Sequence, residues 1–236
     1  MLPHHTTDGL VLQNFRASLK LADFKLIAFD MDSTLINIEC IDELAGAVGL
    51  KAEVAAITEA TMRGEISDFK TSLRRRVALL KGVSVEDMER VYSERLQLNP
   101  GAPELVAACK NAGMKLMLVS GGFTFFANRV ARQLGMDFAK SNELEIDNGL
   151  LTGKLVMQTW GDICDGEEKL SSLLSTCRLL NIEPDQAIAV GDGANDLPMM
   201  AAAGLSVAYH AKPKVRERAM VAINDGGLDR LLEVLK

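Results

Sequence analysis

The chain lacks the features that mark membrane, secreted or nucleic-acid-binding proteins. None of its 236 residues belong to an apolar run approaching about 18 residues, the length of a membrane span. The first residues, MLPHHTTDGLVLQNF, do not place an apolar segment after a basic one, as a leader peptide would. The formal net charge of −6 gives no general attraction to nucleic acid or anionic membranes. We expect a soluble, cytoplasmic protein, monomeric or homodimeric, whose partners are small molecules.

Cysteine is scarce and irregularly placed. The four cysteines are Cys40, Cys109, Cys164 and Cys177. They form no C-x-x-C pair, so neither a disulfide framework nor a zinc site is indicated. We interpret them as small buried hydrophobic residues. The sequence also contains no internal repeat and no low-complexity stretch.

What the sequence does contain is a set of short apolar runs that end on polar residues. These are KLIAFD at 25–30, KLMLVS at 115–120 and AIAVGD at 187–192. They do not alternate, which is typical of parallel strands covered on both faces. We expect the shorter runs LSVAYH at 205 and MVAIN at 220 to extend the same sheet toward the C-terminus. Amphipathic patterns predict helices at 124–134, ending at Gly135, and over EEKLSSLLSTCRLLN at 167–181. We predict an α/β fold with a parallel sheet.

An inserted unit separates the first two strands. Between Thr34 and Val119 lie 84 residues, whereas a parallel crossover needs only a dozen or a few dozen. Helical patterns fill residues 39–99, and Pro100 and Gly101 mark the return. We predict a catalytic core formed by residues 1–38 and 100–236, with a mobile helical cap at 39–99. A second excursion, ELEIDNGLLTGKLVMQ, alternates around Asn-Gly and predicts a hairpin.

Polar side chains at the ends of the predicted strands form the candidate site. In open parallel sheets, ligands bind at the carboxyl ends of the strands, which here bring Asp30, Ser120 and Asp192 to one crevice. Within DMDST, Asp30 is placed to act as a nucleophile that accepts a phosphoryl group. Asp32 is placed to protonate the leaving alcohol and later activate water. The alternative for this motif alone is a polar turn after a strand.

The segment GDGANDLPMM at 191–200 adds Asp192 and Asp196 to the same edge. Carboxylates that converge near a phosphate repel it by roughly 4 kcal/mol per charge pair at 4 Å and an effective dielectric of 20. A divalent cation is therefore required, and oxygen ligands beside a phosphate favour Mg²⁺. We choose Asp30 and Asp192 as its side-chain ligands. The alternative is a simple Asp-Gly loop before a helix.

Two further segments offer partners for phosphate. VSGGF at 119–123 supplies the Ser120 hydroxyl and small-residue amides at a strand end that leads into a helix. Lys169 lies in the first turn of its predicted helix, where the helix dipole disfavours a cation, so a phosphate partner would explain it. The alternatives are an ordinary turn and a solvated lysine.

Together, in this order, these motifs resemble those of the haloacid dehalogenase superfamily of phosphohydrolases. DMDST matches its DxDx(T/V) motif, and Ser120 and Lys169 match its second and third motifs. GDGAND matches the fourth, GDxxxD. The resemblance covers about 25–227 and implies a Rossmann-like core, a phosphoaspartate on Asp30 and bound Mg²⁺. It implies that Mg²⁺ is held by the Asp30 side chain, the Asp32 main-chain carbonyl and a carboxylate of the fourth motif, here Asp192.

A closer resemblance narrows the substrate. DMDSTLINIECIDELA, SLRRRVALLKG, VSGGF and VGDGANDLPMM are similar to members that hydrolyse O-phosphoserine in the last step of serine biosynthesis. This resemblance implies that Glu39 binds the ammonium group of the substrate and that Arg76 binds its carboxylate. An amino acid phosphate needs such an anion and a fork-shaped cation. The phosphate would contact Ser120, Gly121 and Lys169. Asn195 would lie nearby, with Met62 and Phe69 as an apolar lid. The alternative is that Glu39 only begins a helix and that the arginines at 74–76 form a solvated face.

Two other functions remain open on the sequence. The first is a phosphotransferase, or a phosphatase acting on another small phosphorylated metabolite. The second is a non-catalytic phosphate-binding protein of the same fold, whose signature would be loss of Asp30 or Asp32. Both aspartates are present.

Overall fold

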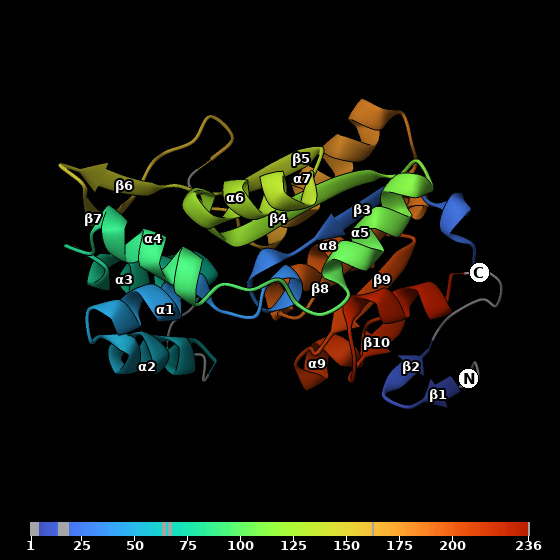
Figure 1. The fold of residues 1–236 in the computed structure, drawn as a ribbon, viewed down its shortest axis with the longest axis horizontal. Helices are drawn as coiled ribbons and strands as arrows, with labels where there is room; N and C mark the ends of the chain where they lie inside the picture. Colours follow the sequence, from blue (N-terminus) through green and yellow to red (C-terminus); the bar gives the residue numbers. More distant parts are fainter. Residues whose placement is uncertain (1–4, 14–18, 63–64, 66–67, 162, 236) are drawn as a thin grey trace.

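The computed structural model describes residues 5–13, 19–62, 65, 68–161 and 163–235 (Figure 1). The strands are β1 (His5–Thr7), β2 (Leu10–Leu12), β3 (Leu26–Phe29), β4 (Lys115–Phe123), β5 (Phe138–Asn142), β6 (Leu144–Asp147), β7 (Leu150–Leu155), β8 (Ala187–Gly191), β9 (Leu205–Tyr209) and β10 (Val221–Ile223). The helices are α1 (Cys40–Ala47), α2 (Lys51–Met62), α3 (Phe69–Leu79), α4 (Val85–Glu94), α5 (Ala102–Asn111), α6 (Thr124–Leu134), α7 (Gly166–Leu180), α8 (Leu197–Ala202) and α9 (Pro213–Arg216).

The central sheet has the order β1-β2-β10-β9-β8-β3-β4-β5 among the described residues. Its strands from β10 to β5 run parallel, while β2 and β1 add an antiparallel edge. The predicted α/β fold is therefore confirmed. The runs at 205 and 220 join this sheet as β9 and β10, as predicted. The edge strands β1 and β2 were not predicted.

The register of the three central strands aligns their carboxyl ends. Phe29 of β3 is paired with Leu118 of β4 on one side and with Val190 of β8 on the other. The residues that follow, among them Asp30 and Asp192, therefore leave the sheet at one edge. The chain continues from β3 to β4 on one side, while β8 lies on the other side of β3. In such sheets, ligands bind at the carboxyl ends of the strands at this position.

Alternate residues of β3 enter two separate cores. Ile27 and Phe29 pack in the core that also contains buried residues of α5 and α6. Leu26 and Ala28 pack in a second core with buried residues of α7 and α8. Helices therefore cover both faces, which explains why these strands are apolar throughout.

The helices α1 to α4 lie together at one end of the molecule, beside the hairpin β6–β7 (Figure 1). The hairpin turns at Asn148 and Gly149, whose φ angles are +47° and +79°, as the sequence predicted. Backbone hydrogen bonds join it to the α3–α4 connection: Gly82 N–H donates to Leu151 O and Leu151 N–H to Val83 O, each at 2.8 Å. The hairpin, which follows β5 in the chain, is thus also hydrogen-bonded to the connection between α3 and α4.

The segments that lead into and out of α1 to α4 are bonded to each other. Asn37 N–H donates to Gln97 O at 3.0 Å. The Asn99 side-chain amide donates to Thr34 O at 2.8 Å and to Ile36 O at 3.0 Å. These bonds close the excursion at its base, so the chain returns to the sheet beside the point where it left.

The two helices predicted from amphipathic patterns are present as α6 and α7. The first ends at Gly135, whose φ of +63° is the left-handed C-cap that glycine accepts most readily. The second ends at Asn181 with a φ of +54°. Within the described ranges, no helix combines the length and apolarity needed to cross a membrane.

The packing of β3 predicts the outcome of a matched pair of truncations. Leu26 is fully buried, whereas Leu179 on α7 is 72% exposed. Leu26→Ala should lower the free energy of unfolding by about 2–5 kcal/mol because it leaves a cavity. Leu179→Ala should change it by less than about 0.5 kcal/mol. Urea denaturation of both variants measures this, and equal losses would contradict the assigned packing.

Candidate active site

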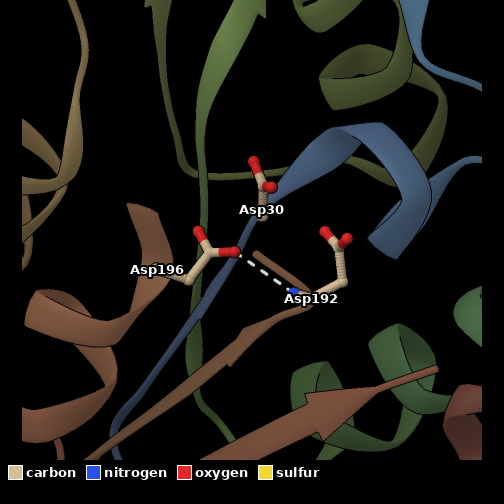
Figure 2. Close-up of side chains that lie close together, drawn as sticks. All are labelled: Asp30, Asp192 and Asp196. Atoms are coloured by element: carbon tan, nitrogen blue, oxygen red, sulfur yellow. Dashed lines mark hydrogen bonds between the residues drawn. The ribbon is translucent and has the colours of Figure 1, made fainter. Parts of the chain in front are cut away.

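Three carboxylates converge where β3 and β8 end (Figure 2). Oxygens of Asp30, Asp192 and Asp196 all lie within 4.8 Å of one another. Asp30 follows β3, and Asp192 follows β8. Asp196 ends a 3₁₀ turn and accepts backbone N–H bonds from Asp192 at 3.1 Å and Gly193 at 2.9 Å. A Cβ on Gly191 would lie only 2.4 Å from the Asp196 carboxyl, so glycine is required there.

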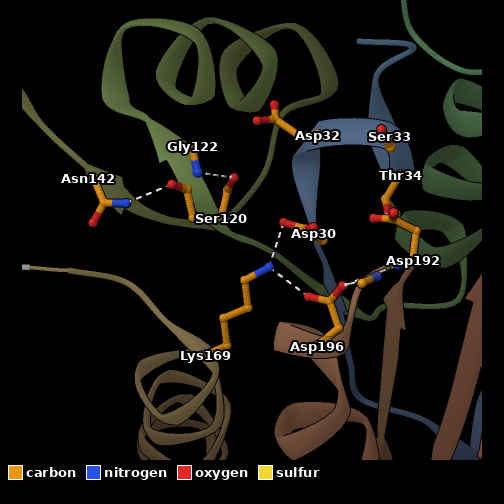
Figure 3. A network of polar contacts seen from close by, with 12 residues as sticks. Asp30, Asp32, Ser33, Thr34, Ser120, Gly122, Asn142, Lys169, Asp192 and Asp196 are labelled. Atoms are coloured by element: carbon orange, nitrogen blue, oxygen red, sulfur yellow. Dashed lines mark hydrogen bonds and ion pairs between the residues drawn. The ribbon is translucent and has the colours of Figure 1, made fainter. Parts of the chain in front are cut away.

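A buried lysine lies against this cluster. The Lys169 ammonium, at the first turn of α7, is fully buried. It donates a hydrogen bond to Asp196 Oδ1 at 2.6 Å and forms an ion pair with Asp30 Oδ1 at 2.7 Å (Figure 3). These carboxylate partners of Lys169 were not predicted from the sequence. Its position in the first turn is explained by two carboxylates, in addition to any phosphate it contacts.

Burial and mutual repulsion alter the acidity of the cluster. Burial and the charge of Asp196 raise the pKa of Asp30 well above its ordinary range, although Lys169 opposes the shift. Burial and the charges of Asp196 and Glu39 raise the pKa of Asp192 to about 7. Burial alone would lower the pKa of Lys169, but the carboxylates of Asp196 and Asp30 outweigh it and keep the pKa above its ordinary value.

The cluster fits a hard divalent cation. All of its donors are carboxylate oxygens, the ligand type that Mg²⁺ and Ca²⁺ prefer. Asp30 Oδ1 is buried and, within the described part of the chain, contacts Lys169 but accepts no hydrogen bond of normal geometry. With the carboxylates ionised, one ammonium faces three negative charges. A bound cation would give Asp30 Oδ1 a second partner beside Lys169 and would supply the missing positive charge.

Asp32 lies apart from these three carboxylates. Its side chain points toward the loop of β4, as Figure 3 shows, and its Oδ1 accepts a hydrogen bond from the Cys40 thiol at 3.1 Å. Burial and the negative charge of Glu39 raise the pKa of Asp32 to about 7. The Asp32 carboxyl can therefore carry or release a proton near neutral pH. A metal-ligating role for Asp32 stays a prediction, and this orientation of the side chain leaves its main-chain carbonyl for it.

The segment Ser120–Gly122, called the Ser120 loop below, is a bulge near the carboxyl end of β4, where the pairing with β5 shifts register. The buried Ser120 Oγ accepts a hydrogen bond from Gly122 N–H at 2.9 Å. A Cβ on Gly122 would lie 3.0 Å from Asp32 Oδ2, so the small residue allows the carboxyl to approach. A Cβ on Gly121 would lie 3.1 Å from Cζ of Phe69. The first residue of α3 is thus held over this loop.

The two residues expected to bind an amino acid differ in their surroundings. Glu39 is exposed, at the N-cap of α1, and accepts a hydrogen bond from the Ser33 hydroxyl at 2.7 Å. Arg76 is half-buried, while Arg74 and Arg75 beside it are exposed. The Arg76 Nε is buried, and it has no hydrogen-bond partner among the residues that the structure describes. Burial lowers the pKa of Arg76, and the charges of Asp42 and Glu39 oppose the shift. Arg76 is therefore not part of a uniformly solvated face.

The remaining predicted residues lie near the edge of the cluster or outside the described side chains. Asn195 is half-buried in the 3₁₀ turn that Asp196 ends. Its backbone oxygen would be 2.9 Å from a Cβ on Gly166, so the turn packs on the start of α7. Met62 ends α2, and its side chain is outside the described part of the chain.

Three contributors to the site were not selected from the sequence. Asp196 was seen in its motif, but only the folded chain reveals its bond to Lys169. Cys40 was interpreted as a buried hydrophobic residue, and it is buried, yet its thiol also contacts Asp32. The Asn142 side-chain amide donates a hydrogen bond to the Gly121 carbonyl of the β4 segment. No short-range signal marks these contacts, because each joins segments that meet only in the fold.

The fold and the site together define a hydrolase of the haloacid dehalogenase type. The family model for haloacid dehalogenase-like hydrolases matches residues 24–204. This range holds all four carboxylates, Lys169 and the loop of β4.

Individual relatives narrow the family. A phosphoserine phosphatase from Polaromonas sp. is 70% identical over 236 residues, with 100% of both chains covered. A solved structure described as a phospho-aspartyl intermediate analogue of phosphoserine phosphatase has a TM-score of 0.82 and 38% identity, covering 90% of this chain and 99% of the other. A substrate-bound phosphoserine phosphatase complex has the same TM-score, identity and coverage. The chain belongs to the phosphoserine phosphatase family.

The raised pKa of Asp192 predicts how cation binding depends on pH. A carboxyl with a raised pKa in the folded state stabilises the metal-free protein below its ordinary pKa, and that stability is lost as pH rises through about 7. A cation must displace this proton, so its affinity should fall about tenfold per unit as pH drops from 7 to 5. The rise in Tm on adding MgCl₂ should therefore be much larger at pH 8 than at pH 5.5.

Thermal unfolding of chelator-treated protein at both pH values makes this measurement. Asp192→Asn is the matched control and should lose most of the Mg²⁺-dependent rise. An equal rise in the wild-type protein at pH 5.5 and pH 8 would contradict the assigned cluster.

Proposed function

We propose that the protein is an Mg²⁺-dependent phosphomonoesterase that hydrolyses O-phosphoserine through a phosphoaspartate on Asp30. The observation that carries the proposal is the position of Asp30. This buried carboxylate, paired with Lys169, lies at the strand edge that also carries Asp192, Asp196 and the Ser120 loop. A site that bound its ligand only through amide or hydroxyl groups would not need so many charged side chains.

Mg²⁺ would be held by the side chains of Asp30 and Asp192 and by the main-chain carbonyl of Asp32. Asp196 is engaged by Lys169 and two backbone N–H groups, so it anchors the cluster and supports the ligands. When bound, Mg²⁺ would neutralise and orient the transferring phosphoryl group.

In the first step, a carboxylate oxygen of Asp30 forms a bond to phosphorus while the ester bond to the serine oxygen breaks. Asp32 gives its proton to that leaving oxygen, for which a pKa of about 7 is well suited. In the second step, Asp32 takes a proton from water as the water attacks phosphorus. The phosphoaspartate then breaks, which releases inorganic phosphate and restores Asp30.

The non-reacting phosphate oxygens are stabilised from two elements. The Ser120 hydroxyl and the Gly121 amide belong to the β4 loop, and Lys169 to α7. Asn195 lies at the rim of the same space. Such preorganised donors contribute most of the catalysis in phosphoryl transfer, because the protein itself does little covalent chemistry.

Residues 39–99 act as a cap that selects the amino acid. Glu39 binds the ammonium, and the Arg76 guanidinium binds the carboxylate with its planar fork. The unpartnered Nε of Arg76 supports this role. Phe69 lies over the Ser120 loop and limits access of water during the first step. The core of residues 1–38 and 100–236 supplies the chemistry.

Replacement of the nucleophile tests the chemistry. Asp30→Asn should lower the rate of phosphate release from O-phosphoserine by more than about 10³-fold, because the covalent route is removed. Asp185→Asn, on the surface, should leave the rate unchanged.

The same assay tests the metal and the substrate. A chelator should abolish wild-type activity, and added MgCl₂ should restore it. Phosphothreonine and sugar phosphates belong in the same assay; if one of them is the preferred substrate, the assignment to phosphoserine is wrong.

A second substitution tests the carboxylate site. Arg76→Lys should raise the KM for O-phosphoserine by about tenfold or more, since a bidentate charged contact is lost. With phosphoethanolamine, which lacks the carboxylate, the same substitution should have little effect. Arg75→Lys is the matched control on the same helix. Equal effects of Arg76→Lys on both substrates would contradict the assignment.

A further inference from the structure

Asn142 is a buried amide that the reaction scheme above does not use. It ends β5 and is 0% exposed. Its Nδ2 donates to Gly121 O at 2.7 Å (Figure 3). Its Oδ1 accepts from Cys164 N–H at 2.7 Å. A side chain that makes two short bonds to two different backbone segments fixes their separation.

The first bond compensates for an interruption in the sheet. The ladder between β4 and β5 pairs Val119 with Lys140 and then Phe123 with Asn142. Three residues of β4, Ser120–Gly122, therefore face only Ser141 on β5, so regular pairing cannot bond all of their backbone groups. The Asn142 side chain satisfies the Gly121 carbonyl in place of the ladder.

This bond also fixes the orientation of a whole peptide plane. The Gly121 carbonyl and the Gly122 N–H belong to one planar unit and point in opposite directions. The carbonyl is bonded to Asn142, and the N–H donates to Ser120 Oγ at 2.9 Å. Because Ser120 Oγ is the acceptor in that bond, its own hydrogen is left to donate to a ligand. Asn142 thus orients the Ser120 hydroxyl through one rigid peptide.

The second bond reaches the element that carries the lysine. Cys164 is followed by Asp165, the N-cap of α7, which accepts from Glu168 N–H at 3.0 Å. Lys169 directly follows Glu168 in the first turn of α7. The Cys164 carbonyl would also lie 3.4 Å from a Cβ on Gly121. Asn142 therefore links the Ser120 loop to the start of α7.

We propose that Asn142 is a positioning residue that sets the Ser120 hydroxyl and the Lys169 ammonium at the spacing required by one phosphoryl group. This inference rests on the proposed function, in which both groups contact that phosphoryl group. Misplacement of a catalytic group by about 1 Å costs about 10²-fold in rate, which sets the expected effect.

Two substitutions test this role. Asn142→Ala removes both bonds. Asn142→Asp, nearly identical in shape, keeps an acceptor for Cys164 N–H but loses the donor to Gly121 O. Both should lower kcat/KM for O-phosphoserine by about 10²-fold and weaken inhibition by inorganic phosphate.

Asp137→Ala is the matched control. Asp137 Oδ2 accepts from Leu116 N–H at 2.9 Å and so ties β4 to β5 at their opposite ends. If Asn142 merely held the strands together, all three variants would reduce the folded fraction and leave KM and phosphate inhibition unchanged per folded molecule. That result would overturn the proposal.

Binding of inorganic phosphate to Mg²⁺-loaded protein, measured by calorimetry, separates this inference from the proposed function. If the wild-type protein binds phosphate but does not hydrolyse O-phosphoserine, the proposed function fails. Loss of phosphate binding in both Asn142 variants, but not in Asp137→Ala, would then still support the positioning role. Unchanged binding in either Asn142 variant would overturn it.

Discussion

The buried ammonium of Lys169, shared between Asp30 and Asp196, is the interaction on which the rest of the site depends. An isolated buried charge is too costly to persist, so the lysine requires both carboxylates and they require it. The pairing fixes α7 against the ends of β3 and β8. It also leaves the acidic cluster with excess negative charge, which a divalent cation would neutralise.

The fold delivers these groups from distant parts of the chain. The register of β3 with β4 and β8 brings Asp30, Asp192 and the Ser120 loop to one edge. The 3₁₀ turn after β8 then offers backbone N–H groups that hold Asp196. From the other side, α3 places Phe69 over Gly121. Charged groups from the sheet and an aromatic side chain from α3 therefore meet in the same place, and this is the basis of the proposed division between catalysis and substrate selection.

The features of the fold that depend on short-range sequence patterns could be predicted from the sequence. The apolar runs predicted the parallel strands, Asn148-Gly149 predicted the hairpin turn, and the residues closing the strands predicted the acidic edge. Features that arise from contacts between distant segments could not be read in this way. The edge strands β1 and β2 are only three residues long; β1 pairs with β2, and β2 pairs with the distant strand β10. The arginines at 74–76 look alike in sequence, and only packing of α3 separates the half-buried one from its exposed neighbours.

The central claim is that the phosphoryl group passes through Asp30, and the most direct measurement is to trap it there. Protein mixed with O-phosphoserine and Mg²⁺, quenched in acid within one turnover and digested, should yield the peptide containing Asp30 with the added mass of one phosphoryl group. Hydroxylamine, which cleaves acyl phosphates, should remove it. Rapid phosphate release with no label on that peptide at any quench time, or with the label on another residue, would contradict the account.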